Sequence, residues 1–301
     1  MWLSILISII SCFFFNNLMP TLIVPGSDYG QIIKYKDSQY FTEQLLQFEN
    51  LQISASSAVV MDVQSDSFIL EKNSEQVWPI ASISKLMSVL VLLEDLKIDL
   101  DDTYVLKASD RRNGGRDYLF QGDEVANKDL LALALISSDN TAVIALISSA
   151  GLSEDEFVKL MNTKAKNLGL KNTIFYDATG LSSANVSTAK EVSFLLKKAL
   201  NNKIISDLVK NYSYSITTVQ GRVKNIKSTN ELLDYFNNNQ SDVKIIGGKT
   251  GFNDSSGYCL GTEFSFREKK YISVVLNASS LNNRFNDTIK LVNEVVSYDN
   301  N

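Results

Sequence analysis

Histidine is absent from the 301 residues of this sequence, and cysteine occurs only twice, as Cys12 and Cys259. The absence of histidine excludes a Ser-His-Asp triad, a Cys-His pair and any metal site that uses imidazole ligands. Two cysteines also exclude a cysteine-rich zinc site and a disulfide framework. We therefore expect no metal and no cofactor. A nucleophile in this chain must take its base from a lysine, a tyrosine or a carboxylate.

Positive charge is also scarce, because 29 Lys and Arg residues face 34 Asp and Glu residues and leave a net charge of −5. No basic surface is available for nucleic acid, so we expect no nucleic-acid partner. The composition, with 45% hydrophobic and 21% charged residues, is typical of globular proteins. The length fits one large domain or two small ones.

The N-terminus carries a short hydrophobic run. Residues 2–15 are interrupted only by serine, and the first lysine is Lys34. This run is shorter than the ~20 apolar residues of a membrane-spanning helix and is typical of a signal peptide. We predict a signal peptide or membrane anchor at residues 1–24, with a lipid-modified Cys12 as a third alternative, and a connector at 25–50. Each alternative places the rest of the chain outside the cytoplasm, in the periplasm or on the outer face of the cytoplasmic membrane.

Strand patterns occur near both ends of the chain, and helical patterns fill the region between them. The predicted strands are 57–63, 67–73, 243–251, 257–264 and 270–278. Residues 82 to about 210 read as helical, and a last amphipathic helix covers 284–298. We therefore predict an α+β fold, in which both chain ends form one antiparallel sheet and the helical middle packs as a separate lobe. A cleft between sheet and lobe is the expected place for a site.

Two details of the helical region can be checked directly. Residues 130–150 resemble a transmembrane segment, but Asp139 lies at its centre, where insertion into a bilayer is costly. Two buried helices joined by a polar corner fit better. Capping boxes are predicted at two helix starts, because Glu156 follows Ser153 by three residues and Glu191 follows Thr188 by three residues.

Ser82 and Lys85 begin a strongly apolar segment, and their spacing places both side chains on one face of a helix. In the first turn, Ser82 would lie among free backbone N–H groups that favour a developing anion. A serine hydroxyl needs a base, and a lysine among apolar neighbours loses its proton more readily because desolvation disfavours the charged form. Taken alone, the pair also fits a serine helix cap followed by an ordinary lysine.

Two further short motifs have similar potential. Ser138 and Asn140 lie two residues apart at the predicted helix corner, where one would relay a proton and the other would hold a substrate amide. Ser and Asn are also preferred helix caps. Lys249 and Thr250 end a predicted strand and offer a positive charge and a hydroxyl suited to a carboxylate. A strand that simply ends in a turn has the same pattern.

Together, the three motifs occur in the order S-x-x-K, S-x-N and K-T-G, which is the signature of penicillin-binding proteins and active-serine β-lactamases. The chain resembles the low-molecular-mass D-alanyl-D-alanine carboxypeptidases and the related DD-endopeptidases over roughly residues 50–297. The block "NLGLKNTIFYDATGLSSANVSTAKEV" is similar to a specific segment of that family. The resemblance implies a catalytic domain at 51–298, with the helical lobe inserted between the strands.

By this resemblance, Ser82 is the acylated nucleophile and Lys85 is its base, while Ser138 and Asn140 assist proton transfer and substrate binding. The implied reaction is acyl transfer. The serine attacks the carbonyl between two D-alanines, or that of a D-centred cross-link, and water hydrolyses the ester. The expected partners are peptidoglycan peptides and β-lactams.

The resemblance also assigns substrate-binding groups. Lys249 and Thr250 would bind the terminal carboxylate of D-alanine or the carboxylate of a β-lactam, and the backbone N–H groups of Ser82 and Phe252 would form the oxyanion hole. Arg284 is a further candidate for carboxylate contact, and its alternative is an ordinary surface arginine at a helix start.

Two alternative functions are a class A β-lactamase and a non-catalytic binding protein. A class A β-lactamase needs a deacylating glutamate in an E-x-x-L-N segment, which residues 141–248 do not contain. A non-catalytic protein that binds β-lactams or wall peptides is the second alternative. The S-I-S-K sequence and the single-domain length favour the endopeptidase-like subgroup, but they do not separate carboxypeptidase from endopeptidase activity.

Overall fold

The structure is a computed structural model and describes residues 52–115, 118–238 and 242–300. The predicted leader at 1–24, with its Cys12 alternative, and the predicted connector at 25–50 lie outside the described residues.

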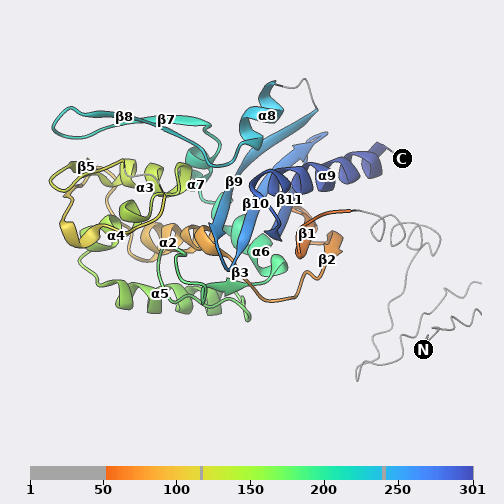
Figure 1. Ribbon diagram of the computed structural model, residues 1–301, viewed down its shortest axis with the longest axis horizontal. Coiled ribbons are helices and arrows are strands. Elements are labelled where there is room, and N and C mark those ends of the chain that lie inside the picture. The colour runs from red at the N-terminus through yellow and green to blue at the C-terminus, as the bar shows by residue number, and fades with distance from the viewer. Residues whose placement is uncertain (1–51, 116–117, 239–241, 301) are drawn as a thin grey trace, which may run out of the picture. The chain divides into compact units, whose positions relative to one another are not determined.

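One five-stranded antiparallel sheet is built from both ends of the described chain, in the order β2-β1-β11-β10-β9 (Figure 1). The first hairpin joins the last strand, because Val59 pairs with Val274 and Ser57 pairs with Leu276. This arrangement confirms the predicted sheet. Its strands are β1 (Ser57–Asp62), β2 (Phe68–Lys72), β9 (Val243–Asn253), β10 (Gly257–Phe266) and β11 (Lys269–Ala278).

The three central strands, β1, β11 and β10, are buried at nearly every position, so both faces of the sheet are covered. The helices that pack on them are α6 (Ala189–Leu200) and α9 (Leu281–Asn300). Gly261 of β10 faces α6, since a Cβ at this glycine would lie at ordinary contact distance, 3.6 and 3.4 Å, from methyl groups of Val192 and Leu196.

The helical lobe surrounds α2, whose six residues are all buried and whose backbone continues into a π-helical turn at Val91–Asp95. The core therefore lies where α2 contacts α3, α5 and α6. The helices of this region are α2 (Lys85–Leu90), α3 (Asn127–Ile136), α4 (Asn140–Ser149), α5 (Glu154–Asn167) and α7 (Lys203–Val209).

Short strand pairs accompany these helices. One ribbon falls within the segment 82–210 that was predicted as helical, β4 (Thr103–Val105) with β5 (Glu124–Ala126). A second ribbon pairs β3 (Trp78–Pro79), just before that segment, with β6 (Val186–Ser187) inside it. The lobe leads to the sheet through elements that the sequence did not predict: the hairpin β7 (Ser213–Thr217) and β8 (Val223–Lys227), then α8 (Leu232–Asn238).

The helix ends test the predicted caps. Ser153 and Glu156 form a reciprocal capping box at the start of α5, as predicted. Thr188 caps α6, because its side-chain oxygen accepts the backbone N–H of Glu191 at 3.1 Å. The Glu191 side chain does not bond back to the N–H of Thr188, so the predicted capping box is wrong here. The Glu191 carboxylate instead accepts the backbone N–H of Asn172 at 2.9 Å and the Thr173 hydroxyl at 2.6 Å. The side-chain amide of Asn172 also donates to this carboxylate, at 3.0 Å, so the neighbouring loop offers it three donors and the helix end offers one.

The polar corner between α3 and α4 forms as predicted. Asp139 is the N-cap of α4, and its carboxylate accepts the N–H of Ala142 at 2.9 Å. Both helices are almost entirely buried in protein. Across the part of the chain that the structure describes, no helix is both long enough and apolar enough to cross a membrane.

Candidate active site

The S-x-x-K segment begins the buried helix α2, but its first turn is 3-10. Ser82 lies in the turn Ala81–Ser84, and Lys85 is the first residue of α2. A spacing of three in a turn of three residues aligns the two side chains. The amine of Lys85 accordingly donates to the hydroxyl oxygen of Ser82 at 2.9 Å.

The backbone before Ser82 is crowded by two other segments. Ala81 has φ +46°, in the left-handed region that residues with side chains rarely adopt. A Cβ at Gly180 would lie 2.0 Å from the carbonyl oxygen of Ala81, and one at Gly251 would lie 2.6 Å from the carbonyl oxygen of Ile80. Glycine at these two positions therefore allows two segments to pack directly against the backbone before Ser82. They are the D-A-T-G loop, residues 177–180, and the K-T-G strand, residues 249–251 of β9.

Lys85 is fully buried, and the hydrogen-bond acceptors that the described residues offer its amine are all neutral. Besides the serine, it donates to Asn140 Oδ1 at 2.7 Å and to the carbonyl oxygen of Thr179 at 2.7 Å. Burial lowers the pKa of Lys85 to about 7, against the opposing attraction of Asp139 and Asp177. An amine with this pKa is partly unprotonated at neutral pH, as a general base must be.

The second and third motifs meet at Lys249, whose side chain is also buried. Its amine donates to the hydroxyl oxygen of Ser138 at 2.7 Å and to the carbonyl oxygen of Thr250 at 3.1 Å. Burial, and then the positive charges of Lys85 and Arg284, hold the pKa of Lys249 well below its usual value. Because Ser138 accepts this hydrogen bond, its own hydroxyl hydrogen is available to another acceptor.

Asn140, the first residue of α4, connects the base to a nearby loop. Its amide nitrogen donates to the carbonyl oxygens of Asn113 at 3.1 Å and Gly114 at 3.0 Å, while its oxygen accepts from Lys85. Both amide hydrogens therefore bond within the protein. The predicted contact between Asn140 and a substrate stays a prediction, and the structure adds that Asn140 holds the lysine and this loop together.

These residues surround one cleft of about 490 Å³. It lies where the start of α2, the α3–α4 corner and the strand β9 come together. The two lysines are buried in its wall. The predicted site residues that line the cleft are Ser82, Ser138, Asn140, Thr250, Phe252 and Arg284.

Arg284 is not the ordinary surface arginine of the alternative interpretation, because only 4% of it is exposed. Its Nη1 donates to the carbonyl oxygen of Gly251 at 3.4 Å, and its guanidinium lies 4.6 Å from the ring centroid of Phe285. Burial lowers the pKa of Arg284 to about 10, so the group stays charged at neutral pH. It therefore adds a positive charge to the cleft beside the K-T-G strand.

Phe252 presents its backbone near the serine and its side chain to the cleft. The ring is 49% exposed and stacks on Tyr258 with ring centroids 4.3 Å apart. A Cβ at the preceding Gly251 would lie 3.3 Å from the backbone nitrogen of Ser82. The two predicted oxyanion donors thus belong to backbone segments that contact each other. Their role as donors stays a prediction.

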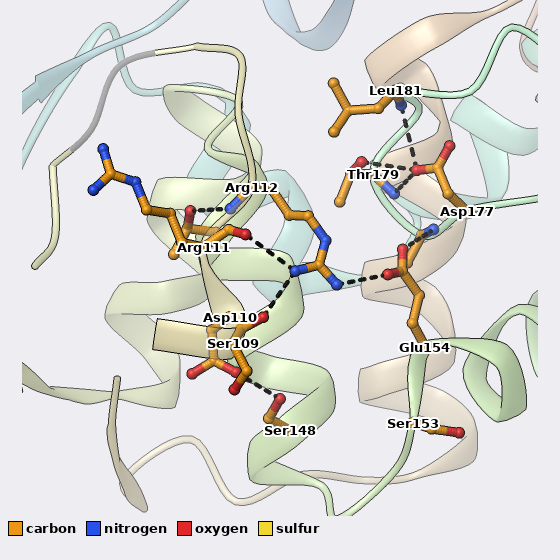
Figure 2. Close-up of polar contacts among 12 residues, drawn as sticks. Ser109, Asp110, Arg111, Arg112, Ser148, Ser153, Glu154, Asp177, Thr179 and Leu181 are labelled. Carbon is orange, nitrogen blue, oxygen red and sulfur yellow. Dashed lines mark hydrogen bonds and ion pairs between the residues drawn. The ribbon is translucent and has the colours of Figure 1, made fainter. Parts of the chain in front are cut away.

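The sequence motifs did not identify the D-A-T-G loop as part of the site. Asp177 organises this loop, since its carboxylate accepts the N–H groups of Thr179 and Ser182 at 2.6 Å and that of Gly180 at 2.7 Å. Figure 2 shows this carboxylate with Thr179 and Leu181. This fixes the Thr179 carbonyl that receives the lysine. The available signal was an aspartate directly before a turn with glycine, a pattern typical of an Asx-turn.

Thr229 is a second residue that the motifs did not reveal. Its hydroxyl oxygen lies 2.6 Å from that of Thr250 across the cleft wall. It lies between β8 and α8, in the region that carried no prediction. Further residues from the same region line the cleft: Tyr212, Lys227, Ser228 and Glu231.

Comparisons with known proteins agree with this geometry. The model of the D-alanyl-D-alanine carboxypeptidase family, peptidase family S11, matches residues 43–280. The D-alanyl-D-alanine endopeptidase of Pseudomonas aeruginosa is 33% identical over 249 residues, which cover 80% of this chain and 76% of that protein.

Solved structures of similar fold include the Streptomyces K15 DD-transpeptidase, with a TM-score of 0.74 and 26% identity over 80% of this chain and 97% of that one. Penicillin-binding protein D2 from Listeria monocytogenes, solved in its ampicillin-bound form, has a TM-score of 0.70 and 32% identity over 81% of this chain and 98% of its own.

Proposed function

Because this chain belongs to the D-alanyl-D-alanine carboxypeptidase family, peptidase family S11, we propose that it cleaves D-alanyl-D-alanine bonds of peptidoglycan peptides through an acyl-serine. One observation carries the proposal. The buried amine of Lys85 lies 2.9 Å from the hydroxyl oxygen of Ser82, in a cleft that the K-T-G strand also lines.

Acylation begins when unprotonated Lys85 takes the hydroxyl proton of Ser82. The serine oxygen then bonds to the carbonyl carbon of the D-alanyl-D-alanine bond, and the carbonyl electron pair moves onto oxygen. The N–H groups of Ser82 and Phe252 stabilise that oxyanion, a contribution typically worth about 3 kcal/mol per donor. Collapse of the intermediate breaks the C–N bond. The proton that Lys85 took from Ser82 passes to the departing amine by way of the Ser138 hydroxyl, which Lys249 holds in place, so that Ser138 keeps a proton and Lys85 is again unprotonated.

Deacylation repeats the same steps with water as the nucleophile. Lys85 takes a proton from water as the water oxygen bonds to the acyl carbon. The ester bond to Ser82 then breaks, and Lys85 returns the proton to the serine oxygen, which restores both groups. Because Lys85 keeps its hydrogen bond to Asn140 and to the Thr179 carbonyl throughout, it stays in position for both halves of the reaction.

The positive wall of the cleft provides for the substrate carboxylate. Thr250 and Arg284 line the cleft and offer a hydroxyl and a charged guanidinium. Lys249 acts from within the wall, where it bonds to the carbonyl oxygen of Thr250. The same groups would receive the carboxylate of a β-lactam, so we expect penicillins to acylate Ser82 as well.

Members of this family act on peptidoglycan, which lies outside the cytoplasm. We accordingly propose that the protein is exported, to the periplasm or to the outer face of the cytoplasmic membrane. The N-terminal hydrophobic run would serve as the export signal or as a membrane attachment.

The test is acylation followed by product analysis. Fluorescent penicillin should label the full chain at Ser82, located by mass spectrometry of peptides, and Ser82→Ala should not be labelled. Purified sacculi should then give products that separate the two activities. A carboxypeptidase releases free D-alanine, whereas an endopeptidase releases cross-linked peptides as monomers. Rapid release of hydrolysed drug would instead indicate a β-lactamase, and labelling without any peptide product would indicate a binding protein.

A further inference from the structure

Two loops that line the cleft lie next to each other. The first loop, residues 109–115, contributes Gly114 and Gly115 to the lining, and the second loop, residues 177–182, contributes Gly180 and Leu181. A Cβ at Gly114 would lie 3.4 Å from Cδ2 of Leu181, so the two loops are neighbours at the cleft.

A pair of charged side chains joins the same two loops at another point. Arg112 donates through Nη2 to Oε2 of Glu154 at 2.9 Å, and Oε1 of Glu154 accepts the backbone N–H of Ala178 at 3.2 Å (Figure 2). Nη1 of Arg112 donates to the carbonyl oxygens of Ser109 at 2.9 Å and Arg111 at 3.1 Å. We call these contacts the Arg112–Glu154 bridge. One carboxylate at the start of α5 thus fixes both loops.

Each loop also carries a group that holds the amine of Lys85. The second loop supplies the carbonyl oxygen of Thr179, one residue beyond the N–H that Glu154 binds. The first loop supplies the two backbone carbonyls that hold the amide of Asn140, whose oxygen accepts from the lysine. Two of the three acceptors around the lysine are therefore set by loops that the bridge connects.

We propose that the Arg112–Glu154 bridge is a positioning pair for acylation, which keeps both loops in place around the amine of Lys85. This inference rests on the proposed function. The Arg112 and Glu154 side chains are 31% and 25% exposed, and partly exposed ion pairs contribute little to stability. Displacement of a reacting group has a much larger effect, since an error of ~1 Å costs roughly 100-fold in rate. The bridge therefore acts on the rate more than on stability.

The test measures acylation by fluorescent penicillin under stopped flow, for the full chain and for Arg112→Ala, Glu154→Gln and the double variant. Glutamine has a single acceptor oxygen and cannot serve both Arg112 and Ala178. We expect the limiting acylation rate to fall roughly 10- to 100-fold, with little change in the half-saturating penicillin concentration or in Tm. The double variant should be no slower than the slower single variant, because both break one bridge. Arg112→Lys should restore part of the rate.

Lys197→Ala is the matched control. It breaks an ion pair with Asp66 in which the lysine side chain is 24% exposed, and neither residue lines the cleft. Limiting rates of both single variants that equal this control would overturn the proposal, as would fully additive losses in the double variant. A full chain that penicillin does not label would overturn the proposed function itself, so the two failures are distinguishable.

Discussion

Lys85 and Lys164 are both buried lysines on helices of the same lobe, yet the hydrogen-bond partners of their amines differ in charge. Among the residues that the structure describes, the hydrogen-bond acceptors of the Lys85 amine are neutral, whereas the Lys164 amine lies 2.8 Å from Asp95 and 3.0 Å from Glu94. Burial lowers the pKa of Lys85 to about 7. Burial also opposes the charge of Lys164, but the two carboxylates outweigh it and raise the pKa of that lysine.

The comparison shows that burial alone does not make a lysine a base. Desolvation disfavours the charged form of both lysines, more strongly for Lys85, which is completely buried, and the carboxylate partners of Lys164 reverse the direction of its pKa shift. A carboxylate restores the proton, and a carbonyl or hydroxyl oxygen restores much less. Variants that alter one lysine or its partners at a time can test this conclusion.

The largest effect is expected from removing the lysine with neutral partners. Lys85→Ala should lower the rate of acylation by penicillin roughly 10³-fold or more, because general base catalysis contributes about 10²- to 10⁴-fold. The far-UV circular dichroism spectrum should stay that of the parent, since the surrounding helix packs through apolar side chains. Normal labelling of this variant would mean that another group deprotonates Ser82.

A second variant gives Lys85 the kind of partner that Lys164 has. Asn140→Asp places a carboxylate at the oxygen that now accepts from Lys85, which should raise the pKa of the lysine from about 7 toward its ordinary value. The unprotonated lysine is the active form, so the acylation rate rises with pH through that pKa. The midpoint of the profile, near pH 7 in the parent, should move to higher pH. If the lysine pKa rises by about 1, the rate at pH 7 should fall by up to about tenfold.

Asn140→Ala is the control for this experiment, because it also loses the contacts to the carbonyls of Asn113 and Gly114 but adds no charge. The comparison between the two variants isolates the effect of the carboxylate. Equal pH midpoints in Asn140→Asp and Asn140→Ala would contradict the account of Lys85.

The third variant changes Lys164, the lysine with carboxylate partners. Lys164→Met removes an ion-pair partner of Glu94 and Asp95, whose side chains are 27% and 41% exposed, and leaves Glu94 its ion pair with Lys198. We expect a loss of about 1–2 kcal/mol in the free energy of unfolding by urea, less than for a fully buried pair because water can solvate the carboxylates. Acylation should be unchanged. A reduced acylation rate at unchanged stability would show that this lysine affects the site.

The smallest effect is expected on the surface. Lys203→Ala breaks an exposed i,i+4 ion pair with Asp207 at the start of α7, and Lys210 remains to bind the same carboxylate at 2.7 Å. Solvent screens such a pair, so Tm and acylation should both match the parent. A clear drop in Tm would indicate that the exposed pairs contribute more than this comparison allows.

The regions that could and could not be predicted differ in a physical way. The hairpin β1–β2, the strands β9 to β11 and the α3–α4 corner have strong apolar patterns and were predicted close to their observed bounds. The hairpin β7–β8 was missed because each strand buries one position, Ile216 or Ile226, and exposes most others. Such a ribbon has little hydrophobic periodicity to detect.

The groups of the site likewise divide into those that the sequence predicted and those that it did not. Ser82, Lys85, Lys249 and Thr250 were found because their side chains form short motifs with fixed spacing. The carbonyl oxygen of Thr179 belongs to the backbone, so its role as an acceptor cannot be recognised from the residue type. Its place beside the lysine depends on a loop far along the chain.

The sequence by itself determined which chemistry is available: without histidine, a serine must take its base from a lysine, a tyrosine or a carboxylate, and the S-x-x-K spacing places a serine and a lysine on one helix face. Only the tertiary structure decided the surroundings that lower the pKa of this lysine. Its pKa depends on complete burial and on acceptors from α4 and the D-A-T-G loop, which packing brings within 2.7 Å. Desolvation and the nature of a partner are properties of three-dimensional surroundings, and local spacing cannot encode them.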